Sequence, residues 1–377
     1  MTEIELSGLD GTNPLGYLAA LGVLRTLNGM PGADASRMRW NTGNWRPAVS
    51  DHRVTSADQL VELLWSGLRR TAGPGAAEAA AAKRSFDEAR TRVKQKRDEI
   101  KRRRLRRAER QVAIDAEVRH LKEEAERLRR LWRLQLAANA PDPAVSLGAN
   151  LTAPDDEFRA FVTDAATTTT AAARAWADFC AAFGCEYGTN DPTKRMQATP
   201  LALINGSGHQ DFLGSIAQLM VQCTADHIRS ALLEPWTYPD EGYSLRLDPL
   251  EDRRYALMAQ DPTGTGNKPR TMWGANRLAF EALPLFPCVA AIPRPKTLCV
   301  REDGDRIFFS WPLWMPPLTL DAVRSLLTLS EIIDDEADSS RQLRARGLLA
   351  VYRTERIRVG SGASRFFNLT PAMPVWC

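Results

Sequence analysis

The chain has 377 residues, of which 44% are hydrophobic and ten are tryptophan, so its composition excludes global disorder and supplies enough apolar side chains for a substantial core. No apolar run approaches the roughly 18 to 20 residues that cross a bilayer, so we expect no membrane contact. Residues 83–133 hold 20 basic and 10 acidic side chains, whereas the rest of the chain holds 30 basic and 36 acidic. A strongly basic segment within a mildly acidic chain predicts a polyanionic partner.

The opening residues and the cysteines predict a cytoplasmic protein. Met1–Glu5 is acidic and lacks the basic and apolar regions of a signal peptide. The six cysteines form no C-x-x-C pair, and a chain of this size does not need a disulfide framework, so we expect reduced thiols.

The N-terminal segment predicts a strand, a turn and a helix. Alternation around Ile4 is typical of a short strand, and the glycine-rich turn after it ends at Asn13, a favourable N-cap. Pro14 suits the first helical position, and leucines at spacings of three and four continue one apolar face as far as Asn28. A second strand is expected near Trp40, and a second capped helix follows from Ser56.

Residues 76–140 predict a helical arm. They contain neither glycine nor proline and are rich in Ala, Glu, Lys, Arg and Leu, which favour helix. Two apolar heptad seams, around residues 86–100 and 118–132, differ in frame by one position and flank a run of cations. A single long helix fits the arm, and so does an antiparallel hairpin with a basic tip; the hairpin also explains the change of frame.

The pattern after the arm predicts a mixed body. We expect a helix over 155–183 with a weak point at Thr167–Thr170, a helix ending near Val221, a strand over Tyr243–Asp248, and short helices over 274–283 and 320–332. Strands are expected over residues 289–292, 297–300, 306–311 and 348–358. The predicted fold class is α+β, a globular body with an inserted basic helix or hairpin, divided as 1–75, 76–140 and 141–377.

The basic run in the arm is the strongest candidate for a binding site. Six cations within seven residues would neutralise phosphates and release counterions, which gives sequence-independent affinity for nucleic acid. A solvated helix face or an acidic protein partner explains the same charges. The candidate DNA contacts here are Lys101, Arg102, Arg103, Arg104, Arg106 and Arg107.

Polar loops supply further candidates. A segment with two glycines before a predicted helix allows close backbone approach to an anion, although a simple helix-entry turn fits it equally well. Amide side chains can also contact base edges. The candidate DNA contacts in loops are Asn205, Ser207, His209, Gln210, Lys268, Arg270 and Asn276.

Catalytic and metal motifs are missing from the sequence. His209, Cys223 and His227 share one region without a zinc spacing, and neither a G-x-S-x-G nor an H-E-x-x-H motif occurs. We therefore predict that the protein is not an enzyme and uses no cofactor and no metal.

Three segments resemble one known family. Residues 6–25, LSGLDGTNPLGYLAALGVLR, are similar to the N-terminus of the large subunits of type I CRISPR interference (Cascade) complexes, with subtype I-G, formerly I-U, the closest. In that family a strand leads into such a helix, and a strand containing Trp follows, as Arg39-Trp40 does here. Residues 244–249, SLRLDP, and 274–279, GANRLA, also resemble this group.

The resemblance implies a non-catalytic subunit of a crRNA-guided complex used in antiviral defence. Such a subunit contacts crRNA, target double-stranded DNA and other Cascade subunits, recognises the protospacer-adjacent motif (PAM), helps to open the duplex, and recruits a helicase-nuclease. The chain is short for a large subunit and lacks the helical C-terminal bundle that is often present there. The alternative functions are a coiled-coil adaptor for another protein and a metal-dependent nuclease.

Overall fold

The computed structural model has the mixed α+β fold that the sequence predicts. It describes residues 2–32, 36–69, 76–103, 105–139, 143–169, 174–186, 195–205, 211–251, 270–291, 295–334, 337–359 and 366–376. The chain forms two compact units. The first comprises Met1–Arg69, Leu147–Ala165 and Ala177–Cys377, and the second Arg70–Ser146 and Ala166–Trp176. Within these described ranges, no helix has both the length and the apolar character that a membrane crossing requires.

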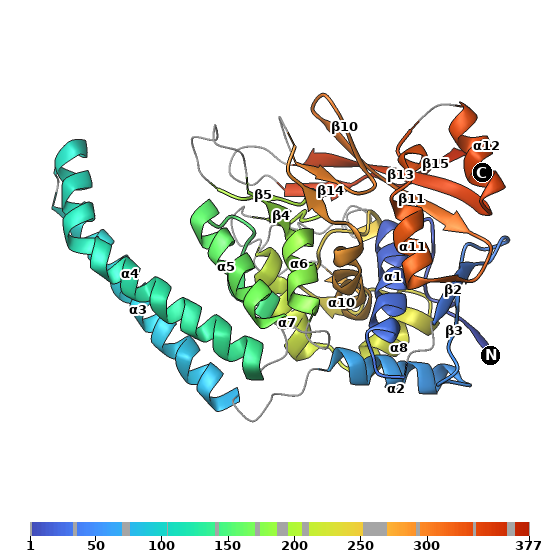
Figure 1. Cartoon of the computed structure of the whole chain (residues 1–377), viewed down its shortest axis with the longest axis horizontal. Coiled ribbons are helices and arrows are strands. Elements are labelled where there is room, and N and C mark those ends of the chain that lie inside the picture. The colour runs from blue at the N-terminus through green and yellow to red at the C-terminus, as the bar shows by residue number, and fades with distance from the viewer. Residues whose placement is uncertain are drawn as a thin grey trace. The chain divides into compact units, whose positions relative to one another are not determined.

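The first two helices, labelled with the others in Figure 1, begin at the capping residues that the sequence predicts. Asn13 caps the first helix and Ser56 the second, and each accepts a hydrogen bond from a backbone N–H of the first turn. The described helices are α1 (Pro14–Asn28), α2 (Ala57–Leu68), α3 (Ala76–Arg102), α4 (Arg107–Asn139), α5 (Asp155–Thr168), α6 (Ala175–Phe183), α7 (Phe212–Gln222), α8 (Ala225–Leu233), α10 (Trp273–Ala282), α11 (Leu320–Leu327) and α12 (Ala337–Ala345).

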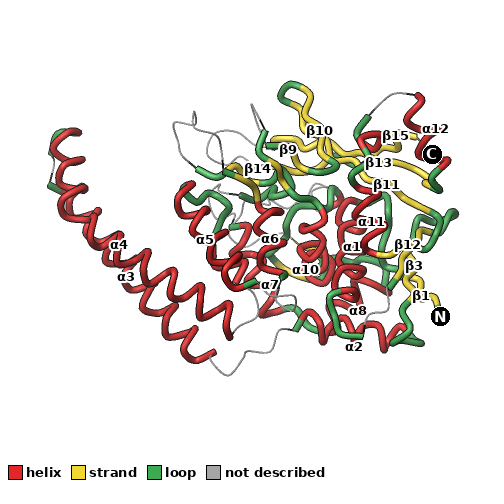
Figure 2. The backbone as a smooth tube through the Cα atoms, viewed as in Figure 1, coloured by secondary structure: helices red, strands yellow, loops and turns green. Residues whose placement is uncertain are grey.

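Two antiparallel sheets account for most of the strands in the first unit (Figure 2). A four-stranded sheet has the order β1 (Glu3–Glu5), β3 (Pro47–Ser50), β2 (Arg37–Trp40) and β12 (Leu318–Thr319). A five-stranded sheet has the order β10 (Val300–Asp303), β11 (Arg306–Trp314), β13 (Leu348–Val359) and β14 (Phe366–Leu369), with β15 (Met373–Trp376) also paired to β13. Two-residue strands form three small pairs: β4 (Gly184–Cys185) with β5 (Gln197–Ala198), β6 (Asp240–Glu241) with β7 (Arg270–Thr271), and β8 (Cys288–Val289) with β9 (Lys296–Thr297).

Helix α1 lies at the centre of the first unit and is buried along nearly its whole length. It packs along α10, and Gly22 allows the close approach, because a Cβ at this position would overlap the carbonyl oxygen of Leu278. Tyr17 of α1 stacks on Trp40 of the first sheet, with ring centroids 5.6 Å apart, and lies 5.7 Å from Trp311 of the second. One aromatic cluster therefore joins α1 to both sheets.

Several predicted elements differ from the structure. The strand predicted over residues 297–300 is a turn between β9, which ends at Thr297, and β10, which begins at Val300, and the strand predicted over residues 289–292 ends at Val289. The strand predicted over Tyr243–Asp248 is wrong: Tyr243 and Arg246 have φ of 57° and 58°, in the left-handed region, which is incompatible with a regular strand. The helix predicted over 320–332 ends at Leu327, and a short 3₁₀ turn follows it. The weak point predicted at Thr167–Thr170 is confirmed, because α5 ends at Thr168.

Candidate nucleic-acid interface

The arm is an antiparallel hairpin of α3 and α4, which lie side by side in Figure 1. Ala89, Ile100 and Val118 are buried in the seam between the two helices. Phe86 stacks on Trp132 with ring centroids 5.7 Å apart. The hairpin explains why the heptad frame changes across the basic run, since the two seams belong to separate helices that face each other.

The turn of the hairpin uses side chains in place of glycine or proline. The carboxylate of Glu109 accepts a 3.0 Å hydrogen bond from the backbone N–H of Arg106, just before the first turn of α4. Arg110 donates to the carbonyl oxygen of Leu105 at 3.2 Å. These bonds satisfy backbone groups where the chain reverses, so the basic run becomes the tip of the arm.

The predicted tip cations fall into two groups. Arg103 bridges the helices, with Nη1 2.6 Å from Glu117 and Nη2 2.5 Å from Glu99, and these hydrogen bonds raise its pKa above the usual value. Lys101 lies 3.1 Å from Asp98. The second group is exposed and forms no ion pair with any residue that the structure describes; it consists of Arg102, Arg106 and Arg107. Arg104 lies outside the described residues.

The predicted loop contacts lie in the first unit, and those that are described have structural roles. Asn205 accepts from the backbone N–H of Leu151 at 2.7 Å and donates to its carbonyl oxygen at 3.2 Å. Arg270 is exposed but pairs with Glu241 at 2.9 Å. Four predicted contacts lie outside the described residues: Ser207, His209, Gln210 and Lys268.

Asn276 requires a correction. It is 0% exposed, its Oδ1 accepts from the backbone N–H of Leu245 at 2.9 Å, and its Nδ2 donates to Thr271 and to the Met272 carbonyl oxygen. No polar group of this side chain is left for a base. The prediction that Asn276 contacts DNA is wrong because its amide is part of the core.

A basic stripe on α3 was missed in the sequence. Arg90, Lys94, Arg97 and Lys101 recur at spacings of four, three and four residues, which places them on one helix face, and all four are exposed. The signal in the sequence is the helical spacing of these four cations, three of which lie outside the dense run of charge at residues 101–107.

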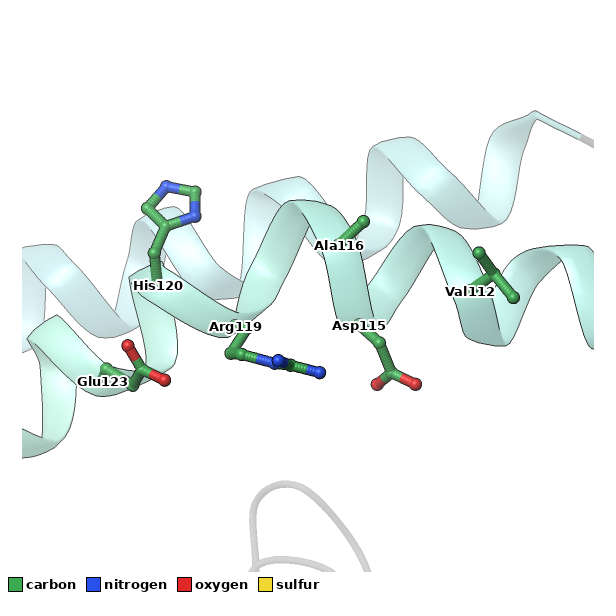
Figure 3. Close-up of a pocket in the computed structure, with 6 residues that line it drawn as sticks. All are labelled: Val112, Asp115, Ala116, Arg119, His120 and Glu123. Carbon is green, nitrogen blue, oxygen red and sulfur yellow. The ribbon is translucent and has the colours of Figure 1, made fainter.

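The outer face of α4 carries a shallow hollow of about 470 Å³ (Figure 3). Asp115, Arg119 and Glu123 project from the same side of the helix there, and Val112 nearby is 68% exposed. Because charges of both signs alternate over this face, it has no electrostatic preference for a polyanion.

The three segments that resemble the CRISPR family meet in one buried network. Asn13 donates to Asp248 at 2.8 Å, and Asn276 accepts from Leu245. The carboxylate of Glu251 accepts hydrogen bonds from the hydroxyls of Ser244 and Thr271. Burial raises the pKa of Glu251 to about 8, and the neighbouring Asp248 carboxylate adds to the rise.

The described residues offer little for metal or nucleophilic chemistry. No group of three or more His, Cys, Asp or Glu side chains among them is arranged to hold a metal ion. His227 is engaged locally, since its Nδ1 accepts from the backbone N–H of Thr224 at 3.0 Å and its Nε2 lies 3.4 Å from Asp240. Burial raises the pKa of the Cys223 thiol to about 12, which disfavours a nucleophilic thiolate.

No protein-family model matches the chain, and a search of curated proteins finds no match to its sequence.

Proposed function

We propose that this chain is a non-catalytic, nucleic-acid-binding subunit of a type I CRISPR crRNA-guided surveillance complex in the cytoplasm. In this role the arm holds the phosphate backbone of target double-stranded DNA, while the body contacts crRNA and other subunits. The subunit recognises the PAM, assists duplex opening, and recruits a helicase-nuclease that cuts the DNA.

The observation that supports nucleic-acid binding is the positive charge at the tip of the arm. Arg102, Arg106 and Arg107 are exposed there without an ion pair to any described residue. Guanidinium groups free of carboxylates attract phosphates and release condensed counterions when they bind. The tip therefore favours a sequence-independent contact with a nucleic-acid backbone, as expected where guide pairing supplies the specificity.

The assignment to a guided complex rests on the resemblance of three segments. Residues 6–25, 244–249 and 274–279 are far apart in the sequence, yet hydrogen bonds join them in one buried network. This arrangement supports the interpretation that the three resemblances belong to one structural feature. Co-purification of the chain from its native cell with a repeat-derived RNA and backbone subunits tests this assignment. Its purification without RNA, after gentle lysis at low salt, would contradict it.

DNA binding by the tip is tested by charge reversal. The Arg102→Glu/Arg106→Glu/Arg107→Glu variant should bind a duplex of about 30 base pairs at least roughly 100-fold more weakly at ~0.1 M salt. The Arg84→Glu/Arg119→Glu/Arg127→Glu variant changes net charge equally at other exposed positions of the arm. Equal losses in the two variants would remove the tip from the proposed function.

A second candidate function is a coiled-coil adaptor that binds another protein. The mixed charges and exposed Val112 on the outer face of α4 favour this alternative, because such a face suits a protein partner better than a phosphate backbone. An adaptor would capture a partner protein through the arm and show no arm-dependent shift of DNA at low salt.

A further inference from the structure

The two flanks of the arm differ in charge. On one flank Arg92, Lys96 and Arg103 each pair with a carboxylate of the hairpin, at distances of 3.1, 3.1 and 2.5 Å. Their partners are Glu99, Glu117 and Glu124. Three cations therefore meet three carboxylates, and this flank is close to neutral.

The cations of the neutral flank hold the hairpin together. Arg92 reaches across from α3 to Glu124 of α4, and Glu117 of α4 accepts from both Lys96 and Arg103. Ion pairs at an exposed surface are individually weak, but a network that links two helices fixes their register. The charges of these three side chains are therefore used in ion pairs within the arm.

The basic stripe on α3 has a different character. Arg90, Lys94 and Arg97 form no ion pair with any described residue, and Lys101 pairs with Asp98, which is half-buried. The Lys101 side chain lowers the pKa of Asp98, with smaller contributions from Lys94 and Arg102, so one carboxylate lies among several cations. The stripe keeps a net positive charge along its length.

We infer that the basic stripe on α3, formed by Arg90, Lys94, Arg97 and Lys101, is a track for the phosphate backbone of one strand of duplex DNA, so that the arm lies along the duplex and does not touch it with the tip alone. This inference rests on the proposed function. The stripe covers 12 residues, so its first and last side chains are 11 steps or about 16.5 Å apart along the helix, and one DNA strand places a phosphate every ~3.4 Å along its axis. The stripe therefore spans about five nucleotides.

The inference is tested by removing the stripe charges without reversing them. Arg90→Gln/Lys94→Gln/Arg97→Gln is the stripe variant, and glutamine preserves the helix. The control variant is Arg84→Gln/Arg119→Gln/Arg127→Gln, which removes the same charge from exposed cations that likewise form no ion pair with a described residue. Helix content from circular dichroism should match the wild type for both variants.

Binding is measured by fluorescence anisotropy with a labelled duplex of about 30 base pairs, between about 50 and 200 mM salt. The stripe variant should lose three phosphate contacts, so the slope of log K against log salt should become shallower by about 2.7. At ~0.1 M salt its affinity should fall on the order of 100-fold, whereas that of the control should fall much less.

The other outcomes separate the stripe from the proposed function. The tip variant is Arg102→Gln/Arg106→Gln/Arg107→Gln. If this variant loses DNA binding while the stripe variant keeps the affinity of the wild type, the track is overturned and the proposed function still stands. Equal losses in the stripe and control variants would also overturn the track. Tighter stripe-dependent binding of single-stranded DNA or RNA would overturn the duplex assignment, as would competition by polyglutamate as strong as by DNA. A wild-type protein that binds no nucleic acid would overturn both proposals.

Discussion

The side-chain amide of Asn13 donates a 2.8 Å hydrogen bond to the carboxylate of Asp248, 235 positions away in the sequence. The same Asn13 caps α1 by accepting from the backbone N–H of Leu15 at 2.9 Å. Asp248 also accepts from the hydroxyl of Tyr238 at 2.7 Å and is 3% exposed. One side chain thus fixes the start of the central helix and satisfies a buried carboxylate.

Replacing Asn13 should therefore destabilise the first unit through both of its roles. For Asn13→Ala we expect a loss of about 2–4 kcal/mol in the free energy of unfolding, about 1 from the lost cap and 1–3 from the unsatisfied carboxylate. Urea unfolding followed by tryptophan fluorescence measures this loss. Ser56→Ala is the matched control, since Ser56 only caps α2, and it should cost about 1 kcal/mol. Equal costs for the two variants would mean that the bond to Asp248 contributes nothing.

Gly22 offers a test of the contact between α1 and α10. Alanine normally stabilises a helix by about 1 kcal/mol relative to glycine, but here its Cβ would overlap the carbonyl oxygen of Leu278. Gly22→Ala should therefore destabilise the protein by about 1–3 kcal/mol, as overpacking does. At Gly29, which caps the same helix with φ −80°, the nearest atom to a Cβ is 3.4 Å away. Gly29→Ala should be nearly neutral, and a neutral Gly22→Ala in the same thermal unfolding assay would contradict the close contact.

The sequence predicted the features that depend on neighbouring residues. The caps at Asn13 and Ser56 and the break after Thr168 were predicted because capping and helix propensity act over three or four positions. The α+β class followed from the same local periodicities. The heptad frame shift pointed to a hairpin but could not decide it, because the turn depends on the bond from Arg106 to Glu109 and contains no helix breaker.

Features that depend on distant partners could not be predicted. Asn276 resembled a surface amide because the partners of its three side-chain hydrogen bonds include Leu245, which is 31 positions away in the sequence, besides Thr271 and Met272. The segment Tyr243–Asp248 alternates like a strand, yet Leu245 and Leu247 are buried in an irregular loop that bonds to Asn276. The ion pair of Arg103 likewise could not be predicted, because its partner Glu117 lies on the facing helix α4.

Substitutions at the tip should distinguish a cation that stabilises the hairpin from a cation that binds DNA. Arg103 bridges Glu99 and Glu117, whereas its neighbour Arg102 forms no ion pair with any described residue. Arg103→Gln should accelerate hydrogen exchange of amides in the first turns of α4, because a link between the helices is lost. Arg102→Gln should leave exchange unchanged and weaken binding to duplex DNA several-fold at ~0.1 M salt. The reverse pattern, with faster exchange in Arg102→Gln alone, would show that the two roles are misassigned.

The buried network should also make the stability of the protein depend on pH. Burial, with a further contribution from Asp248, raises the pKa of Glu251 to about 8, well above the value of an unfolded glutamate. The folded state therefore holds a proton that the unfolded state releases, so this stabilisation is complete below about pH 4.5 and is lost as pH rises through about 8. Each proton changes the free energy of unfolding by at most about 1.4 kcal/mol per pH unit, and urea unfolding across this range measures the slope.

Glu251→Gln tests the origin of this pH dependence. Ser244 and Thr271 contact different oxygens of Glu251, and glutamine offers one carbonyl oxygen and one amide N–H at these two places, as a protonated carboxyl group does, but does not ionise. The variant should lose much of the decline in stability between about pH 5 and pH 8 and should be the more stable protein at the alkaline end. Asp248 and Asp240, whose pKa values burial also raises, contribute to the remaining slope. A decline as steep in Glu251→Gln as in the wild type would show that Glu251 is already ionised in the folded protein at neutral pH.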